Sequence, residues 1–119
     1  MKTFKDKREV GQFIYVVLFI TTADDEEAQL ISRILLEQKK AACVSIVPKV
    51  SSLFWWQGNI EQAKESLLVV KTRAELLDEI AKLVKEIHSN DVPEIIALPI
   101  VGGSQDYLEW VGEETREAE

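Results

Sequence analysis

The sequence feature that most constrains the fold is a pair of long strand-like segments, residues 41–58 and 60–72. In the first segment, β-branched and aromatic residues alternate with serine, which is typical of a pleated, half-buried strand. Gly58 and Asn59 tolerate positive φ at little cost, so they predict a turn where the segments meet. Strands in small domains usually run about 5–6 residues. The two segments therefore predict an unusually long β-hairpin.

Pro48 and two tryptophans indicate how such a hairpin is used. Pro48 has no N–H to donate to a strand ladder, so we expect it at an edge, a bend or a bulge. Trp55 and Trp56 are adjacent in the strand and therefore point to opposite faces. A long arm with an outward aromatic suits pairing between subunits. Trp55 and Trp56 are thus candidate assembly residues; the alternative is that both indoles pack within one subunit.

The other segments alternate between strand-like and helix-like patterns. Apolar runs predict strands in residues 13–22 and 94–101, and apolar residues at helical spacing predict helices between them. The expected helices run from Thr22 or Asp24 to Lys39 or Lys40, from a capping box of Thr72 and Glu75 to His88, and briefly after Ser104 or Asp106. The order β-α-β-β-α-β plus a short C-terminal helix is that of an α+β, ferredoxin-like sandwich. This fold has one antiparallel sheet with two helices on one face.

Length and charge bound the organisation and the partners of the chain. For 119 residues we expect a flexible N-terminal tail in residues 1–11, one domain in residues 12–112 and an acidic C-terminal tail in residues 113–119. The net charge of −7 argues against nucleic acid as a partner, since phosphate binding needs clustered Lys and Arg. The apolar run in residues 13–20 is too short to span a membrane, so we expect no membrane partner either. The single cysteine excludes an intramolecular disulfide and fits a cytoplasmic location.

Five short motifs between residues 40 and 110 are informative when taken together. They read Lys40-Ala41-Ala42-Cys43-Val44, Trp55-Trp56-Gln57-Gly58-Asn59-Ile60-Glu61, Val70-Lys71-Thr72, Val92-Pro93-Glu94-Ile95-Ile96-Ala97-Leu98-Pro99-Ile100 and Asp106-Tyr107-Leu108-Glu109-Trp110. Each motif is weak alone, but their order and spacings are specific. Over residues 13–111 the chain resembles the CutA family of divalent-cation tolerance proteins.

The resemblance implies a tight homotrimer in which long hairpins pair between subunits, in agreement with the long hairpin predicted above. It also implies cytoplasmic binding of copper or another divalent metal, with no enzymatic turnover. Proposed copper ligands in one branch of the family are a cysteine after the first strand and two adjacent histidines. The corresponding positions here are Thr21, Ile87 and His88, so His88 is the candidate metal ligand. The alternative is that His88 only caps the C-terminus of its helix as a cation.

The resemblance further implies a charged cleft between subunits, for which the candidate ligand-binding residues are Glu61, Lys71, Asp91 and Glu94. Carboxylates with an imidazole suit a hard or borderline divalent ion. The alternative is that Lys71 and a glutamate form a structural ion pair across the trimer. Ser51, Ser52 and Ser104 have no histidine nearby in the sequence, and Cys43 has no activating partner in sequence, so we expect no enzyme.

Three functions follow from these observations. The first is a homotrimeric metal-tolerance protein that binds a divalent cation, with copper as the first candidate. The second is a trimer similar to the PII signalling proteins that binds a small anion or nucleotide between subunits. It is disfavoured because Gly102-Gly103 is the sole glycine-rich candidate for a phosphate loop. The third is a structural scaffold whose role is the trimer itself.

Overall fold

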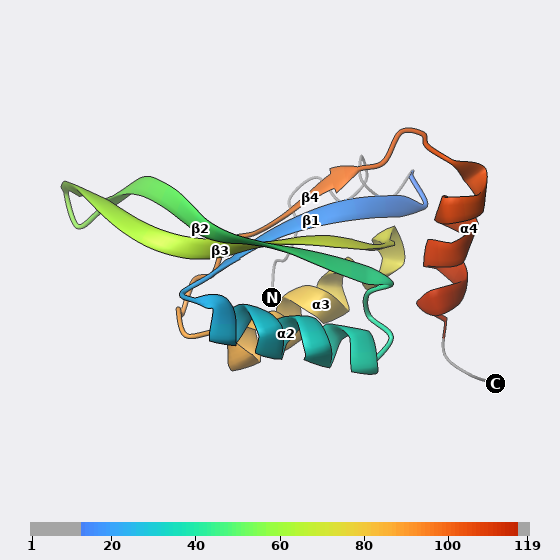
Figure 1. Cartoon of the computed structure of the whole chain (residues 1–119), viewed down its shortest axis with the longest axis horizontal. Coiled ribbons are helices and arrows are strands. Elements are labelled where there is room, and N and C mark those ends of the chain that lie inside the picture. The colour runs from blue at the N-terminus through green and yellow to red at the C-terminus, as the bar shows by residue number, and fades with distance from the viewer. Residues whose placement is uncertain (1–12, 117–119) are drawn as a thin grey trace.

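The fold is a four-stranded antiparallel sheet with two helices on one face and a third helix at one end (Figure 1). The computed structural model describes residues 13–116, so the tail predicted in residues 1–11 lies outside the described residues. The elements are β1 (Tyr15–Thr22), α2 (Asp25–Glu37), β2 (Cys43–Trp56), β3 (Asn59–Arg73), the 3₁₀ turn η1 (Ala74–Leu76), α3 (Leu77–Ile87), β4 (Ile95–Pro99) and α4 (Gln105–Glu114). The strand order β2-β3-β1-β4, with antiparallel neighbours, confirms the predicted ferredoxin-like α+β fold.

The core lies between α2, α3 and one face of the sheet. Alternate residues of β1 are fully buried, as expected for a strand with one face on the core. The other side of the sheet, which we call the open face, carries the residues that alternate with the buried ones and pair across the strands. These are Val17 and Phe19 of β1, Cys43, Ser45 and Val47 of β2, Leu67, Val69 and Lys71 of β3, and Ile96 and Leu98 of β4. Of these, Val47, Ile96 and Leu98 are 43%, 49% and 44% exposed.

The β2–β3 hairpin is as long as the sequence predicted, with strands of 14 and 15 residues. It forms an arm that projects beyond the sheet on the side away from α4 (Figure 1). Gln57 and Gly58 turn the chain with φ of 49° and 81°, and Asn59 already begins β3. The register shifts between Val47 and Val50, so Pro48 lies at a β-bulge, as the sequence predicted.

Two helix boundaries differ from the predictions. Asp24 caps α2 as expected, but the helix ends at Glu37 because Lys39 adopts a left-handed φ of 59°. The predicted capping box at Thr72 is wrong: β3 continues to Arg73, and α3 has no side-chain cap. Thr72 is buried in the sheet, where its hydroxyl donates to the carbonyl of Lys40 at 2.6 Å.

The C-terminal helix α4 extends beyond the expected domain boundary at residue 112. Ser104 caps it by accepting from the Tyr107 N–H at 3.4 Å, as predicted. The helix runs through Glu114, and Thr115 is buried, with its hydroxyl and carbonyl oxygens each 2.8 Å from the Arg73 guanidinium. Residues 117–119 of the predicted acidic tail lie outside the described residues. No helix within residues 13–116 is both long and apolar enough to cross a membrane.

Candidate functional site

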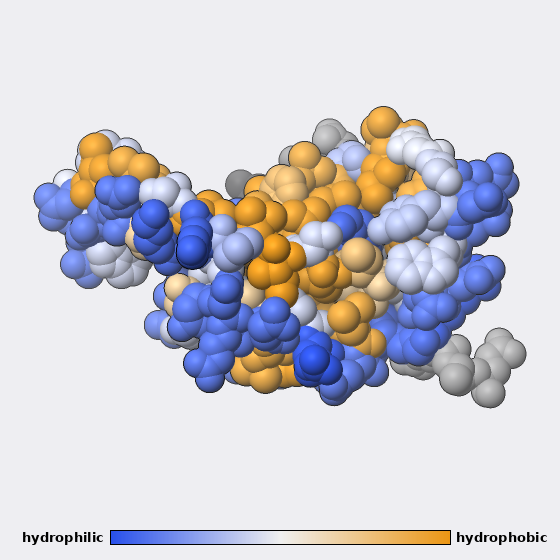
Figure 2. Space-filling model, viewed as in Figure 1, coloured by the Kyte–Doolittle hydropathy of each residue, from blue (hydrophilic) through white to orange (hydrophobic). Residues whose placement is uncertain are grey.

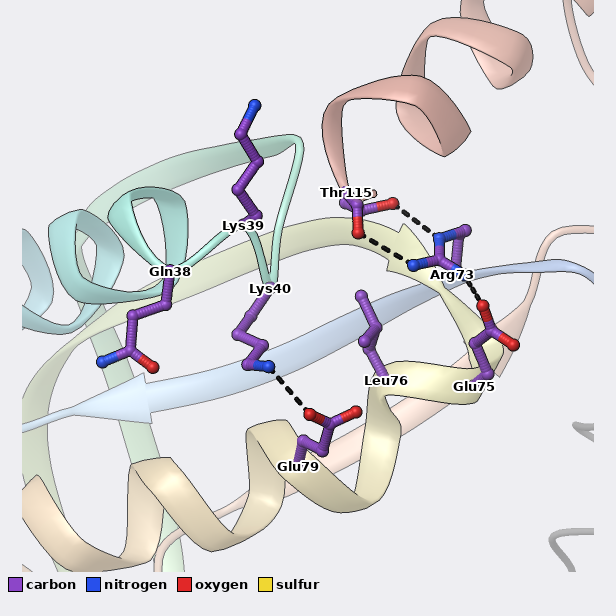
Figure 3. Close-up of a pocket in the computed structure, with 8 residues that line it drawn as sticks. All are labelled: Gln38, Lys39, Lys40, Arg73, Glu75, Leu76, Glu79 and Thr115. Atoms are coloured by element: carbon purple, nitrogen blue, oxygen red, sulfur yellow. Dashed lines mark hydrogen bonds and ion pairs between the residues drawn. The ribbon is translucent and has the colours of Figure 1, made fainter. Parts of the chain in front are cut away.

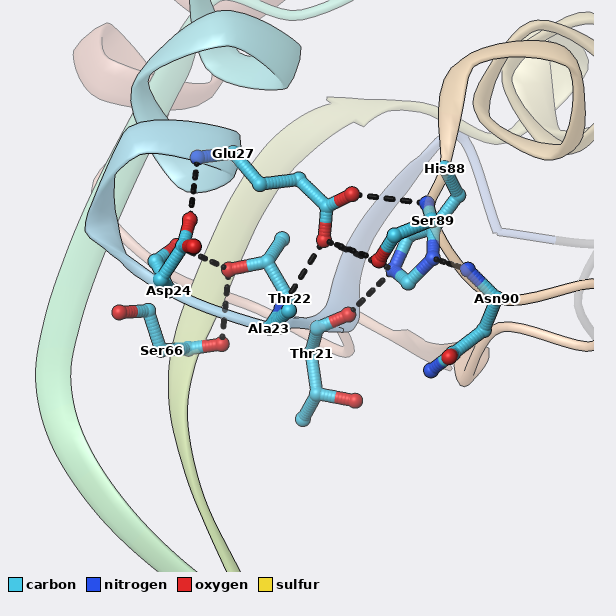
Figure 4. Close-up of polar contacts among 9 residues, drawn as sticks. All are labelled: Thr21, Thr22, Ala23, Asp24, Glu27, Ser66, His88, Ser89 and Asn90. Carbon is cyan, nitrogen blue, oxygen red and sulfur yellow. Dashed lines mark hydrogen bonds and ion pairs between the residues drawn. The ribbon is translucent and has the colours of Figure 1, made fainter.

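His88, the predicted metal ligand, is buried between the end of β1, the start of α2 and the segment after α3 (Figure 4). Its Nδ1 accepts a hydrogen bond from the Asn90 N–H at 3.0 Å. The ring proton must therefore sit on Nε2, which lies 2.7 Å from the carbonyl oxygen of Thr21 and donates to it. Both ring nitrogens are occupied in this way, and neither offers a free lone pair to a metal.

Glu27 is the anion beside this histidine. Its Oε1 accepts from the Ala23 N–H at 2.9 Å and the Ser89 hydroxyl at 3.1 Å, and its Oε2 accepts from the Ser89 N–H at 2.7 Å. Partial burial raises the pKa of Glu27, but these hydrogen bonds and the neighbouring His88 outweigh burial, so the pKa lies below its usual value. The carboxylate therefore ties the segment after α3 to the start of α2. The Asp24-x-x-Glu27 spacing of a capping box was the sequence signal that could have identified it.

The donor set around His88 does not fit a copper ion. The positions that correspond to the other proposed ligands hold Thr21 and Ile87, and Thr21 contributes only the carbonyl that receives the His88 proton. Neither residue supplies the thiolate or thioether that Cu(I) prefers. Within residues 13–116, no three His, Cys, Asp or Glu side chains are grouped so that they could hold a metal.

Lys71 lies on the open face close to polar side chains of β2 whose proximity the sequence did not predict. Its Nζ donates to Ser45 Oγ at 2.7 Å and lies 3.8 Å from Cys43 Sγ. Tyr107 reaches this cluster from α4 by a hydrogen bond to Cys43; partial burial and then the adjacent thiol raise the pKa of the phenol. Strand alternation places Cys43 and Ser45 on one face, but their contact with Lys71 depends on the β2–β3 register.

Glu94 lies at the other end of the open face, just before β4. Partial burial and then repulsion from Glu65 of β3 raise the pKa of Glu94 above its usual value. Neither carboxylate forms an ion pair with another residue in the described part of the chain. The two residues are therefore an uncompensated acidic pair.

The structure does not bring the four predicted cleft residues together within one chain. Glu61 lies in the arm opposite Phe54, and Asp91 is exposed in the segment between α3 and β4. At about 3.3 Å per residue, Glu61 is roughly 33 Å along β3 from Lys71. A cleft that contains all four would need residues from more than one chain.

The two predicted assembly residues lie near the tip of the arm. Trp55 and Trp56 are 73% and 59% exposed. They pair across the hairpin with Ile60 and Asn59, so the two indoles point to opposite faces. The alternative that both indoles pack within one subunit does not hold for the single chain.

A polar cavity of about 260 Å³ lies between the end of α2, the end of β3 and the start of α3 (Figure 3). Its lining residues are Gln38, Lys39, Lys40, Arg73, Glu75, Leu76, Glu79 and Thr115. The main charges are satisfied internally, since Lys40 pairs with Glu79 at 2.8 Å and Arg73 pairs with Glu75. The cavity therefore shows no unsatisfied charge that calls for a ligand.

Comparison with known proteins identifies relatives across the whole described fold. The model of the family described as "CutA1 divalent ion tolerance protein" matches residues 16–114. The chain is 44% identical over 103 residues to a chloroplastic CutA 1 protein of Oryza sativa, covering 87% of this chain and 58% of that protein. It is 46% identical over 96 residues to the divalent-cation tolerance protein CutA of Archaeoglobus fulgidus, covering 81% and 93%.

Solved structures agree with these sequence relatives. The crystal structure of CutA1 from Oryza sativa superposes with a TM-score of 0.86 at 42% identity, covering 89% of this chain and 97% of that one. The divalent cation tolerance protein of Thermus thermophilus superposes with a TM-score of 0.85 at 41% identity, covering 87% and 100%. The chain spans somewhat over half the length of the plant relatives and nearly all of the archaeal one.

Proposed function

Because the chain belongs to the CutA1 divalent ion tolerance protein family, we propose that it is a homotrimeric divalent-cation tolerance protein that binds a divalent cation without catalysing a reaction. The family resemblance read from the sequence is confirmed over residues 16–114. Relatives from Thermus thermophilus and Archaeoglobus fulgidus are named divalent-cation tolerance proteins. For this chain we propose the trimer, the bound cation and the absence of catalytic turnover.

The observation that carries the proposal is the projecting arm with its exposed apolar side chains. Near the tip, Leu53, Trp55 and Ile60 are 67%, 73% and 62% exposed. Figure 2 shows hydrophobic surface at the end of the arm, separated from the body by a hydrophilic stretch. Within residues 13–116, the outer edge of β2 is also an unpaired sheet edge of 14 residues, a template for another strand. An arm of this form supports pairing with further copies of the chain.

The cation site needs a different composition from the one the sequence suggested. His88 has no free nitrogen, so we propose that the cation is held by oxygen donors from more than one copy, in a site suited to hard or borderline ions. Copper is the first metal to test because the family resemblance implies it. Turnover is not proposed, because the single histidine of the sequence is held by Thr21 and Asn90 and cannot serve Cys43 as a base.

We propose a cytoplasmic location and self-association as the main partnership, without nucleic acid or membrane. Cys43 is a free thiol, which suits a reducing compartment. The names of relatives vary in this respect: the rice protein is called chloroplastic, and the Archaeoglobus fulgidus structure is described as periplasmic. Fractionation of cells with an antibody to the chain tests the location.

Two measurements test the proposal. Native mass spectrometry should give three times the chain mass, and a single-chain mass at micromolar concentration would refute the assembly. Isothermal titration of the assembled protein with Cu²⁺, Zn²⁺ and ATP separates the three functions. Metal binding that is unchanged in His88→Gln supports the proposed oxygen site. Loss of metal binding in His88→Gln would instead identify His88 as a ligand.

The second candidate, a sensor of a small anion, is favoured by one observation only. The hydrogen-bond partners of the Lys71 ammonium on the open face are neutral, and no carboxylate within residues 13–116 pairs with it. Binding of ATP that depends on Lys71 would support this candidate. If neither Cu²⁺, Zn²⁺ nor ATP binds, the structural scaffold is the function that remains.

A further inference from the structure

Helix α4 is seated at the end of the sheet where β1 begins and β3 ends (Figure 1). The polar group on this part of the open face, which we call the Lys71 cluster, consists of Lys71, Ser45 and Cys43. Tyr15 and Arg73 pair with each other and follow on from the cluster on the same face of the sheet. Gly112 of α4 packs against Tyr15, and Tyr107 hydrogen-bonds to Cys43. Helix α4 therefore lies against the Lys71 cluster.

Little of α4 is buried, in contrast to α2 and α3. Its buried residues are Val111 and Gly112, whereas α2 and α3 each bury four residues. The segment that leads into α4, residues 101–104, is exposed and belongs to no helix or strand, and a Cβ added at Gly102 would meet nothing within 4 Å. Hinges are commonly short loop segments of this kind. A helix with few buried contacts can separate from a sheet while the core stays folded.

Arg73 fastens the C-terminal end of α4 to β3. Its Nε donates to the Thr115 hydroxyl and its Nη2 donates to the Thr115 carbonyl, each at 2.8 Å. Thr115 is buried and the Arg73 side chain is 16% exposed, so water replaces these charged hydrogen bonds poorly. The Lys39–Glu114 ion pair at the same end spans 3.8 Å between half-exposed side chains and adds little. The fastening is separate from the cluster, because Thr115 is eight residues from Tyr107, about 12 Å along the helix.

We propose that α4 is a hinged cover over the Lys71 cluster, bending at residues 101–104 and held closed by the hydrogen bonds between Arg73 and Thr115. With α4 in place, Tyr107 occupies one side of the cluster. When α4 is displaced, the Cys43 thiol and the Lys71 ammonium are open to a small molecule or anion. The movement takes place within one chain, so this proposal does not rest on the trimer or on the bound cation proposed above.

The reactivity of Cys43, the single cysteine of the sequence, measures how often the cover opens. The native protein is treated with iodoacetamide, an uncharged reagent whose approach does not depend on the charge of Arg73, and labelling is followed by mass spectrometry. Arg73→Leu removes both hydrogen bonds to Thr115 and should increase the labelling rate at least about tenfold. Thr115→Val removes one of them without a change of charge and should increase the rate about threefold. The combined variant should label within about threefold of Arg73→Leu, because both changes remove the same contact.

Glu27→Ala is the matched control, because Glu27 ties α2 to the segment after α3 at the other end of β1. This change lowers the stability of the whole fold and should leave the labelling rate within about twofold of the wild type. Hydrogen exchange followed by mass spectrometry locates the movement. In Arg73→Leu the amides of α4 should exchange faster, whereas those of α2 and α3 should keep their wild-type rates.

Several results would overturn the cover. Wild-type protein that labels as fast as a short unstructured peptide around Cys43 would show that nothing covers the thiol. Labelling of Arg73→Leu at the wild-type rate would show that Arg73 does not hold α4. Equal acceleration in Glu27→Ala, or faster exchange in every helix of Arg73→Leu, would assign the labelling to unfolding of the whole chain. The trimer and the cation are measured separately, by native mass and by titration, and their failure changes none of these expectations.

Discussion

Replacing Glu27 tests the network around His88 most directly. The carboxylate accepts three hydrogen bonds, from the Ala23 N–H, the Ser89 N–H and the Ser89 hydroxyl, at 2.7–3.1 Å. Glu27→Ala removes all of them, but Ala23 and Ser89 are exposed, so water can satisfy the donors afterwards. At about 1 kcal/mol for each such bond, we expect the free energy of unfolding to fall by about 2–3 kcal/mol. Glu27→Gln keeps one acceptor oxygen and should lose about half as much.

The pH dependence of the free energy of unfolding provides an independent test of the role of the Glu27 carboxylate. The folded-state pKa of Glu27 is lower than its ordinary value of 4.5. A depressed acid pKa contributes stability that is present above pH 4.5 and is lost as the pH falls through the folded-state value. The difference between the wild type and Glu27→Gln should therefore be constant near neutral pH and shrink below about pH 4.5.

Equilibrium unfolding in guanidinium chloride, followed by tryptophan fluorescence, measures both effects. Protein concentration must be held fixed, because the proposed self-association would contribute to the apparent stability. Glu26→Gln is the matched control, since Glu26 is an exposed neighbour in the same first turn. Two results would refute the reasoning. One is a fall of less than about 0.5 kcal/mol in the free energy of unfolding of Glu27→Ala. The other is a stability difference between the wild type and Glu27→Gln that stays unchanged down to about pH 3.

Three further substitutions probe other parts of the molecule. Trp56→Ala should weaken the proposed trimer by about 2 kcal/mol or more, and an unchanged dissociation constant in sedimentation would argue against a contact between subunits at this indole. His88→Gln should lower the unfolding midpoint without changing Cu²⁺ affinity, because both ring nitrogens already have protein partners; calorimetric titration checks the second point. In Gly112→Ala the added Cβ would lie 3.0 Å from the Tyr15 hydroxyl, so either Tyr15 or α4 must move. The melting temperature should therefore fall by several degrees. A melting temperature equal to that of the wild type would show that Tyr15 moves aside freely.

The sequence predicted the fold well because most of its elements have strong local signals. Alternation in residues 41–72 predicted the long hairpin, and the missing N–H of Pro48 predicted the irregularity in β2. Boundaries were less predictable where tertiary contacts decide them. Thr72 has the composition of a helix cap, yet burial in β3 and a hydrogen bond to Lys40 hold it in the sheet. Helix α2 ends earlier than predicted because Lys39 adopts a left-handed φ, and the sequence has no glycine at this position to indicate such a turn.

The candidate site was less accessible to sequence reasoning. The hydrogen-bond partners of His88 are backbone groups, one of them 67 residues away along the chain, and composition carries no information about such pairs. The cluster at Lys71 depends on which residue of β2 lies opposite it, and a bulge makes that register ambiguous until the strands are paired. The resemblance to a family supplied the charged residues, while the structure supplied their separation.

The bulge at Pro48 has a consequence for how this family can change in length. Val47 and Val50 are three positions apart in β2 but lie opposite Leu67 and Glu65, which are two positions apart in β3. Deleting one residue here would restore plain alternation while Val50 stayed opposite Glu65, so Trp55 and Trp56 would keep their partners and their faces. A single codon lost at this point would thus remove the local bend and extra twist of the arm without altering the side chains that it presents. Relatives aligned with a one-residue gap at this bulge should therefore keep the outer surface of the arm and differ in the direction in which the arm extends.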